Sequence, residues 1–236
     1  MVKRIEDMSS ATLAKIAGVG YLVIFFSGFF ANFFVLEGLI IPGDAVGTAG
    51  NIVADSGLFR WGFVSFVVMV TVDIGLAWVL YLLFLPVNRN LSLFAAWLRL
   101  VNGAVFAVAL YHLFSVLRLS GGAAYLGVFG AGEIPAHIML SLTAFSDTWL
   151  IGLIFFALHL FMLGLMVVMS GLIPRALGVL LMIAAAGYLT DSFANILIQD
   201  YDAHKALFLM IVAVPGVIGE LSFSLWLLIK GVRTPV

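Results

Sequence analysis

The sequence predicts an all-α integral membrane protein, a bundle of six transmembrane helices, on the basis of two observations. The first is composition: 64% of the 236 residues are hydrophobic and only 10% are charged, whereas about 25% of an ordinary soluble domain is charged. The second is that long apolar runs recur six times along the chain, and each is close to or above the roughly 20 residues that cross a bilayer. We therefore expect a multi-pass membrane protein in contact with the lipid bilayer.

The six apolar runs define the helices of the predicted bundle, which we treat as one domain over residues 1–236. The predicted spans are residues 13–36, 61–85, 93–117, 143–169, 176–198 and 206–229. The first run is too long for the apolar region of a cleaved signal peptide, and no A-x-A-like site follows it. We expect it to remain in the protein as a membrane anchor.

The distribution of Lys and Arg predicts the orientation of the bundle, because cytoplasmic loops carry an excess of these residues. With both termini inside, the cytoplasmic side and its margin hold Lys3, Arg4, Lys15, Arg89, Arg99, Arg175, Lys230 and Arg233. The opposite side holds only Arg60, Arg118 and Lys205. The sequence therefore predicts that the N and C termini are both cytoplasmic.

Composition and spacing also exclude several classes of function. The net charge of -1 gives no basic surface for nucleic acid, and the absence of Cys removes disulfides, thiolate metal sites and thiol catalysis. Every Lys lies at or beyond the end of a span, so none is placed to form a retinal Schiff base. His112 and His159 differ in depth by about 13 Å or more on the helical rise, too far for paired haem ligands. We predict no cofactor, no bound metal, no catalytic residue and no nucleic-acid partner.

Four stretches of the chain resemble a known family. They are "GDAVGTAGNIVADSGLFRWG", "LFLPVNRNLSLFAAWLRLVN", "LIFFALHLFMLG" and "SGLIPRALGVLLMIAAAGYLTDSFANIL". Together they resemble the bacterial membrane family catalogued as domain of unknown function 4386, over about Ala14 to Arg233. The resemblance implies a six-helix integral membrane protein of bacterial or archaeal type, for which we expect the plasma membrane as location. It brings no established activity, so it assigns no role to any residue.

The candidate site consists of polar residues near the middle of the spans, because charged groups there are costly and usually face the bundle interior or a wet cavity. These residues are Asp73, Arg99, Asn102, His159 and Glu220. On the helical rise, Asp73, Glu220 and His159 lie about 18 to 24 Å from the outer boundary. Asn102 is about 22 Å deep, and Arg99 is one turn further toward the cytoplasm, within reach of the same layer. The five side chains are therefore expected to converge from four helices.

A second polar group lies closer to the outer boundary, with four of its five members at depths of about 6 to 12 Å. It comprises His112, Asp147, Tyr188, Asp191 and Asn195. Asp191 and Asn195 are spaced i,i+4 and share a helix face, with Tyr188 a turn below. We predict that this group lines an outer vestibule. Aromatic residues near the span ends are expected to form interfacial belts, and they are Trp61, Trp97, Trp149, Tyr21 and Tyr125.

Three hypotheses follow for the residues at the middle of the spans. Asp73 and Glu220 could not both ionise easily at close range, so one should hold a proton while Arg99 favours the charged form of the other. This combination suits proton-coupled binding of a small or amphipathic ligand. In the alternative hypothesis the polar core only specifies packing in an accessory or scaffold subunit, with a protein partner or a second copy of the chain left open. In the third, the carboxylates and imidazole form a metal site of an intramembrane enzyme, which the Arg99 cation opposes.

Overall fold

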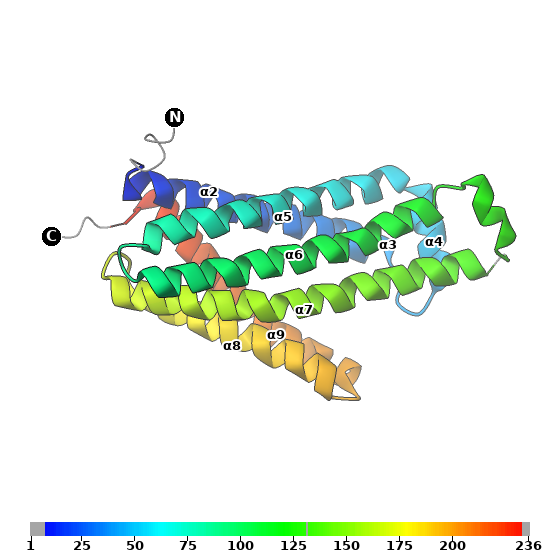
Figure 1. The fold of residues 1–236 in the computed structure, drawn as a ribbon. Coiled ribbons are helices and arrows are strands. Elements are labelled where there is room, and N and C mark those ends of the chain that lie inside the picture. The colour runs from blue at the N-terminus through cyan, green and yellow to red at the C-terminus, as the bar shows by residue number, and fades with distance from the viewer. Residues whose placement is uncertain (1–7, 131, 233–236) are drawn as a thin grey trace. The chain divides into compact units, whose positions relative to one another are not determined.

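The computed structural model describes residues 8–130 and 132–232 of the chain. Of these described residues, 87% are helical and none lies in a strand. The helices, shown in Figure 1, are α2 (Ser10–Phe29), the π-helix η1 (Phe30–Leu36), α3 (Glu37–Leu39), α4 (Ala45–Ala54), α5 (Ser56–Phe84), α6 (Arg89–Leu119), the 3-10 helix η2 (Ala124–Val128), α7 (Glu133–Ser170), α8 (Arg175–Leu197) and α9 (Tyr201–Ile229). This architecture confirms the predicted all-α fold class.

Within the described residues, six helical stretches are long and apolar enough to cross a membrane. They are Ser10–Leu39, Ser56–Phe84, Arg89–Leu119, Glu133–Ser170, Arg175–Leu197 and Ala203–Ile229. Each contains most of one predicted span, which confirms the prediction of a multi-pass bundle. The predicted cytoplasmic location of both termini stays a prediction, and three of the cations on which it depends, Lys3, Arg4 and Arg233, lie outside the described residues.

The start of α7 is the largest correction to the predicted spans. The fourth span was predicted from residue 143, but the helix begins ten residues earlier, at Glu133. Glu133, Pro135 and His137 lower the hydropathy of this segment. Glu133 and Pro135 lie in the first turn of α7, where a carboxylate is favourable and a residue without an N–H is tolerated, so these residues do not prevent the helix.

The contacts divide the chain into two compact units. The first contains residues up to 23 together with 72–103 and everything from 151 on, and the second contains 24–71 and 104–150. Helices α2, α5, α6 and α7 contribute residues to both. The prediction of a single domain over the whole chain stays a prediction.

Glycines allow close helix packing in the first unit. A Cβ on either Gly164 of α7 or Gly178 of α8 would lie 2.6 Å from the carbonyl oxygen of the other. In the same way, a Cβ on Gly187 of α8 would lie 2.6 Å from the carbonyl oxygen of Ile211 on α9, and α8 and α9 run side by side (Figure 1). Small residues at such contacts let backbones approach and increase van der Waals contact, which drives helix association in lipid.

Aromatic side chains form much of the core of the second unit. The rings of Phe106 and Trp149 are stacked, with centroids 3.6 Å apart and planes 5° apart. Phe66 contacts Trp149 and Phe145, with centroids separated by 5.2 and 5.4 Å. The two tilted pairs of Phe66 have the geometry in which aromatic contacts add to the free energy that burial supplies. They hold α5, α6 and α7 together within this unit.

Helix α4 is fixed to the segment that precedes it by side-chain hydrogen bonds. Asp44 accepts from the backbone N–H of Gly47 at 2.8 Å and so caps the helix N terminus. Thr48 accepts from the N–H of Ile41 at 2.9 Å, and the Asn51 amide donates to the carbonyl of Leu39 at 3.2 Å. The connection between the first two spans therefore contains an ordered helix.

Replacing Gly178 with Ala is expected to destabilise the first unit. The added methyl would lie 2.6 Å from the Gly164 carbonyl, so α7 and α8 must separate, at a cost of about 1 to 3 kcal/mol. Unfolding of the purified protein in detergent, followed by circular dichroism, measures the change. Gly75→Ala is the matched control, because nothing lies within 4 Å of a Cβ at that helical position. Equal stability of the two variants would contradict the packing role of Gly178.

Candidate functional site

Arg99 is the centre of the buried polar cluster of the first unit. Its side chain is fully buried on α6 and donates four hydrogen bonds. Two go to Asp73 of α5: Nε donates to the backbone oxygen at 3.2 Å and Nη2 to Oδ1 at 2.5 Å. Nη1 donates to the hydroxyl of Tyr21 on α2 at 3.2 Å and lies 2.9 Å from Nε2 of His159 on α7. One guanidinium thus joins four helices, as the sequence analysis predicted for Asp73, Arg99 and His159.

The hydrogen bonds of His159 define its charge state. Nδ1 lies 2.8 Å from the backbone oxygen of Ala95, and a carbonyl can only accept, so Nδ1 carries a hydrogen. Nε2 faces Nη1 of Arg99, and a guanidinium can only donate, so Nε2 supplies a lone pair. The ring is therefore neutral, with its hydrogen on Nδ1. Of the acceptors of Arg99, only the Asp73 carboxylate is therefore charged.

Aromatic rings complete the enclosure of the guanidinium. Cζ of Arg99 lies 5.1 Å from the ring centroid of Tyr21 and 5.7 Å from that of Phe156, both within the range of a cation–π interaction. Tyr21 in turn packs edge-on against Phe223 of α9, with centroids 5.8 Å apart. An unpaired buried charge would be strongly destabilising, and here the Asp73 ion pair, neutral acceptors and π-faces together compensate the charge of Arg99.

Tyr21 is a member of the polar cluster that the sequence prediction placed wrongly. It was expected in the interfacial belt, but its side chain is 5% exposed and accepts a hydrogen bond from Arg99. The predicted first span begins at residue 13, whereas α2 begins at Ser10. The earlier start places Tyr21 about 16 Å along the helix, since each residue adds about 1.5 Å.

Asn102 lies three residues after Arg99 on the same face of α6. Its side-chain nitrogen donates to the backbone oxygen of Gly152 on α7 at 3.0 Å. Its Oδ1 and the Oδ2 of Asp73 are two of the four buried side-chain polar atoms that have no hydrogen-bond partner among the described residues. Buried acceptors are nearly always paired, so these two oxygens represent unused capacity to accept a hydrogen bond.

Glu220 lies on α9 and is partly exposed, unlike the other four predicted residues. Its Oε1 accepts a hydrogen bond of 3.0 Å from the hydroxyl of Tyr188 on α8. Arg99 and Asp73 are within electrostatic range of this carboxyl group. Gly216, one turn before Glu220, leaves room for the Tyr188 hydroxyl, because a Cβ there would lie 3.2 Å from it. Tyr188 was predicted for the outer vestibule, and the structure places its hydroxyl on Glu220.

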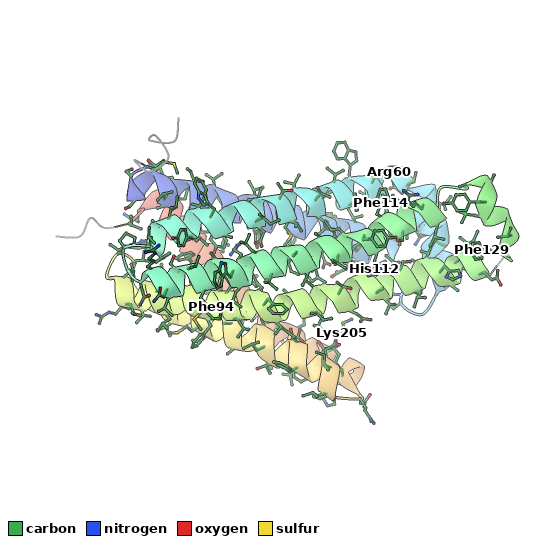
Figure 2. The ribbon with its side chains drawn as sticks, viewed as in Figure 1. Arg60, Phe94, His112, Phe114, Phe129 and Lys205 are labelled. Atoms are coloured by element: carbon green, nitrogen blue, oxygen red, sulfur yellow. The ribbon has the colours of Figure 1, made fainter. Side chains whose placement is uncertain are left out.

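The remaining residues of the predicted vestibule are divided between the two units. Asp191 and Asn195 belong to the first, where Asp191 accepts a hydrogen bond of 2.5 Å from the Tyr201 hydroxyl and Asn195 is exposed. His112 and Asp147 belong to the second, and His112 projects from α6 as Figure 2 shows. The vestibule formed by all of these residues together stays a prediction.

A cavity of about 550 Å³ lies in the second unit, outside the polar cluster. Mostly apolar residues of α4, of the end of α6 and of the start of α7 line it, and none of the ten sequence-predicted site residues is among them. In the part of the chain that the structure describes, no group of three or more His, Asp or Glu side chains is placed to hold a metal ion.

Comparison with known proteins identifies the chain's relatives. The family described as "Domain of unknown function (DUF4386)" matches residues 16–231. The chain belongs to this family. An uncharacterized protein of Archaeoglobus fulgidus is 30% identical to this DUF4386 chain over 171 residues, which cover 72% of the chain and 84% of the relative. No solved structure matches the DUF4386 chain.

Replacing Asp73 with Leu is expected to destabilise this DUF4386 protein by about 3 to 5 kcal/mol, because it leaves the buried guanidinium of Arg99 without a counter-ion. The double variant Asp73→Leu with Arg99→Met should recover most of that loss, since it removes both charges while keeping apolar volume. Unfolding of the single and double variants in mixed detergent measures both effects. A double variant less stable than the single one would contradict this account of the ion pair.

Proposed function

We propose that this DUF4386 protein binds a small or amphipathic ligand within the membrane, at the polar cluster of Asp73, Arg99, Asn102, His159 and Glu220, and that binding is coupled to a proton. The observation that carries the proposal is the pair of buried oxygens, Asp73 Oδ2 and Asn102 Oδ1, that lack a hydrogen-bond donor. Intramembrane ionisable residues are functional candidates by default, and here they occur together with unused acceptors.

The hydrogen-bond inventory indicates which ligand chemistry fits. Most of the donor capacity of the Arg99 guanidinium is already used, because it gives four of its five N–H groups to protein acceptors. The two unpartnered buried atoms among the five residues of the cluster, Asp73 Oδ2 and Asn102 Oδ1, are both acceptors. The favoured ligand is therefore a hydrogen-bond donor, such as a hydroxyl or amine carried on an apolar tail, and an anionic headgroup is disfavoured.

Charge supports the coupling to a proton. Asp73 and Glu220 are two acidic groups within electrostatic range of one guanidinium, and His159 adds no positive charge in its hydrogen-bonded form. A ligand that brings or displaces a positive charge therefore changes the net charge of the cluster. Interaction energies between charges are large in a region of low dielectric constant, so gain or loss of a proton by the cluster would offset that change.

We further propose a plasma-membrane location with both termini in the cytoplasm. The support for this orientation is the excess of Lys and Arg on one side of the predicted spans.

A scaffold role is the second candidate, and one observation favours it. Asp73, Arg99 and His159 are at most 2% exposed, which is the arrangement expected of a dry network that specifies helix packing. The two candidates differ in what Asn102 does: a scaffold needs only its bond to Gly152, whereas a ligand site also uses its free oxygen.

Asn102→Leu is therefore the discriminating variant. In lipid nanodiscs, we expect the wild-type protein to bind dodecylamine and dodecanol, which donate hydrogen bonds, in preference to dodecanoate. The variant removes one free acceptor, so binding should weaken by about tenfold, the effect of roughly 1.4 kcal/mol. Binding is measured with radiolabelled probes, and empty nanodiscs correct for partition into lipid.

Asn51→Leu is the matched control, because Asn51 also donates its side-chain amide to a backbone carbonyl but lies in the second unit. Both variants should lose a similar, modest amount of stability, about 1 kcal/mol. Unchanged binding by Asn102→Leu, together with the same stability loss as the control, would favour the scaffold role.

A further inference from the structure

The two acidic groups of the polar cluster have different environments. Asp73 is 2% exposed and forms an ion pair with Arg99. Glu220 is partly exposed, and its Oε1 accepts a hydrogen bond from a neutral hydroxyl, that of Tyr188. It also lies on α9, where 17% of the most apolar stretch is buried, against 44% for α5, which carries Asp73. Glu220 is therefore the more accessible of the two carboxyl groups, and the one without a directly bonded cation.

The charges of the cluster do not balance when both carboxyl groups are ionised. Arg99 supplies one positive charge, and the hydrogen bonds of His159 require a neutral ring. Asp73 compensates Arg99 through the ion pair, so an ionised Glu220 would be an uncompensated negative charge inside a membrane-spanning helix. Such a charge is unfavourable in hydrocarbon, and one bound proton removes it.

The groups that face Glu220 come from several helices. Tyr188 of α8 donates to its Oε1, and Arg99 of α6, Asp73 of α5 and Tyr21 of α2 lie within electrostatic range. On α7, His159 contacts Arg99 through the nitrogen that lacks a hydrogen. Arg99 is the one cation in this set, and it is already paired with Asp73.

The backbone of α9 is locally weakened beside Glu220. Pro215 has no N–H, so the carbonyl of Ile211, four residues earlier, receives no helical hydrogen bond from it. That carbonyl lies against Gly187 of α8, where a Cβ would be 2.6 Å away. Proline and glycine at successive positions are a common cause of helix bending, and Pro215 and Gly216 precede Glu220 by little more than one turn.

We propose that Glu220 holds an exchangeable proton inside the membrane span and that the polar cluster takes up and releases its proton at this residue, while Asp73 stays ionised beside Arg99. Tyr188 is a positioning residue, which fixes the carboxyl group through Oε1. On release, the proton of the Glu220 carboxyl group passes to water and leaves a carboxylate that still accepts from Tyr188. This inference rests on the proposed function and names the group through which the proton coupling operates.

The test is labelling of the full-length protein in nanodiscs with dicyclohexylcarbodiimide, an apolar reagent that reacts with protonated carboxyl groups. The carboxyl proton moves to one nitrogen of the reagent, the carboxylate oxygen adds to its central carbon, and transfer of the acyl group to nitrogen gives a stable N-acylurea without another reactant. Peptide mass spectrometry locates the label across a pH series on both sides of neutrality.

We expect label on Glu220 at low pH, with the labelled fraction falling about tenfold for each pH unit above its midpoint. Asp73 should remain unlabelled throughout. Glu220→Gln, which keeps the size of the side chain, should abolish labelling while the helical content is retained. Tyr188→Phe should move the midpoint, whereas Tyr111→Phe, at an exposed position, should leave it unchanged.

Label on Asp73 in place of Glu220, labelling that does not depend on pH, or absence of label on Glu220 would each overturn the inference. Protection of Glu220 by sodium ions at constant pH would also overturn it, because the compensating charge would then be a metal cation. If Asn102→Leu weakens binding of dodecylamine while Glu220 stays unlabelled, the ligand site stands and only the assignment of the proton to Glu220 fails.

Discussion

The buried guanidinium of Arg99 is the constraint on which the first unit depends. A permanent charge in the interior of a membrane bundle needs compensation from every direction, and this one receives it from Asp73, Tyr21 and His159 on three other helices. Each partner must reach Arg99 at a fixed depth and from a fixed side. The packing of α2, α5, α6 and α7 around this residue is thereby specified more narrowly than apolar contacts alone would require.

Glycines and polar bonds act together in this unit. Close approach at Gly187 brings α8 against α9, and Gly216 admits the Tyr188 hydroxyl to the surface where Glu220 lies. The bulk of the neighbouring side chains therefore decides which polar groups can meet. Packing also distinguishes the two acidic residues. Asp73 is enclosed and forms an ion pair with Arg99, whereas Glu220 is partly exposed, as the proposed exchange of its proton requires.

The sequence predicted which residues of different helices lie in one layer better than it predicted which way their side chains point. Because every helical residue adds about 1.5 Å, counting from the span ends placed Asp73, Arg99 and His159 in one layer, and the structure joins them. Counting along the chain cannot show which way a side chain points, since that depends on how each helix is rotated against its neighbours. Tyr188 was therefore grouped with Asp191 by proximity in sequence. The partnership of Tyr21 with Arg99 was missed for another reason, because the first helix begins earlier than its predicted span.

The tautomer of His159 has a consequence for reagents that attack imidazoles. One nitrogen gives its hydrogen to Ala95 and the other offers its electron pair to Arg99, so neither is left over. An acylating agent, a transition metal or a substrate proton could reach the Nε2 lone pair only after the hydrogen bond from Arg99 is broken. The ring of His159 on α7 consequently bridges Arg99 and Ala95 of α6. It can act as a metal ligand or a base only if one of these hydrogen bonds is broken.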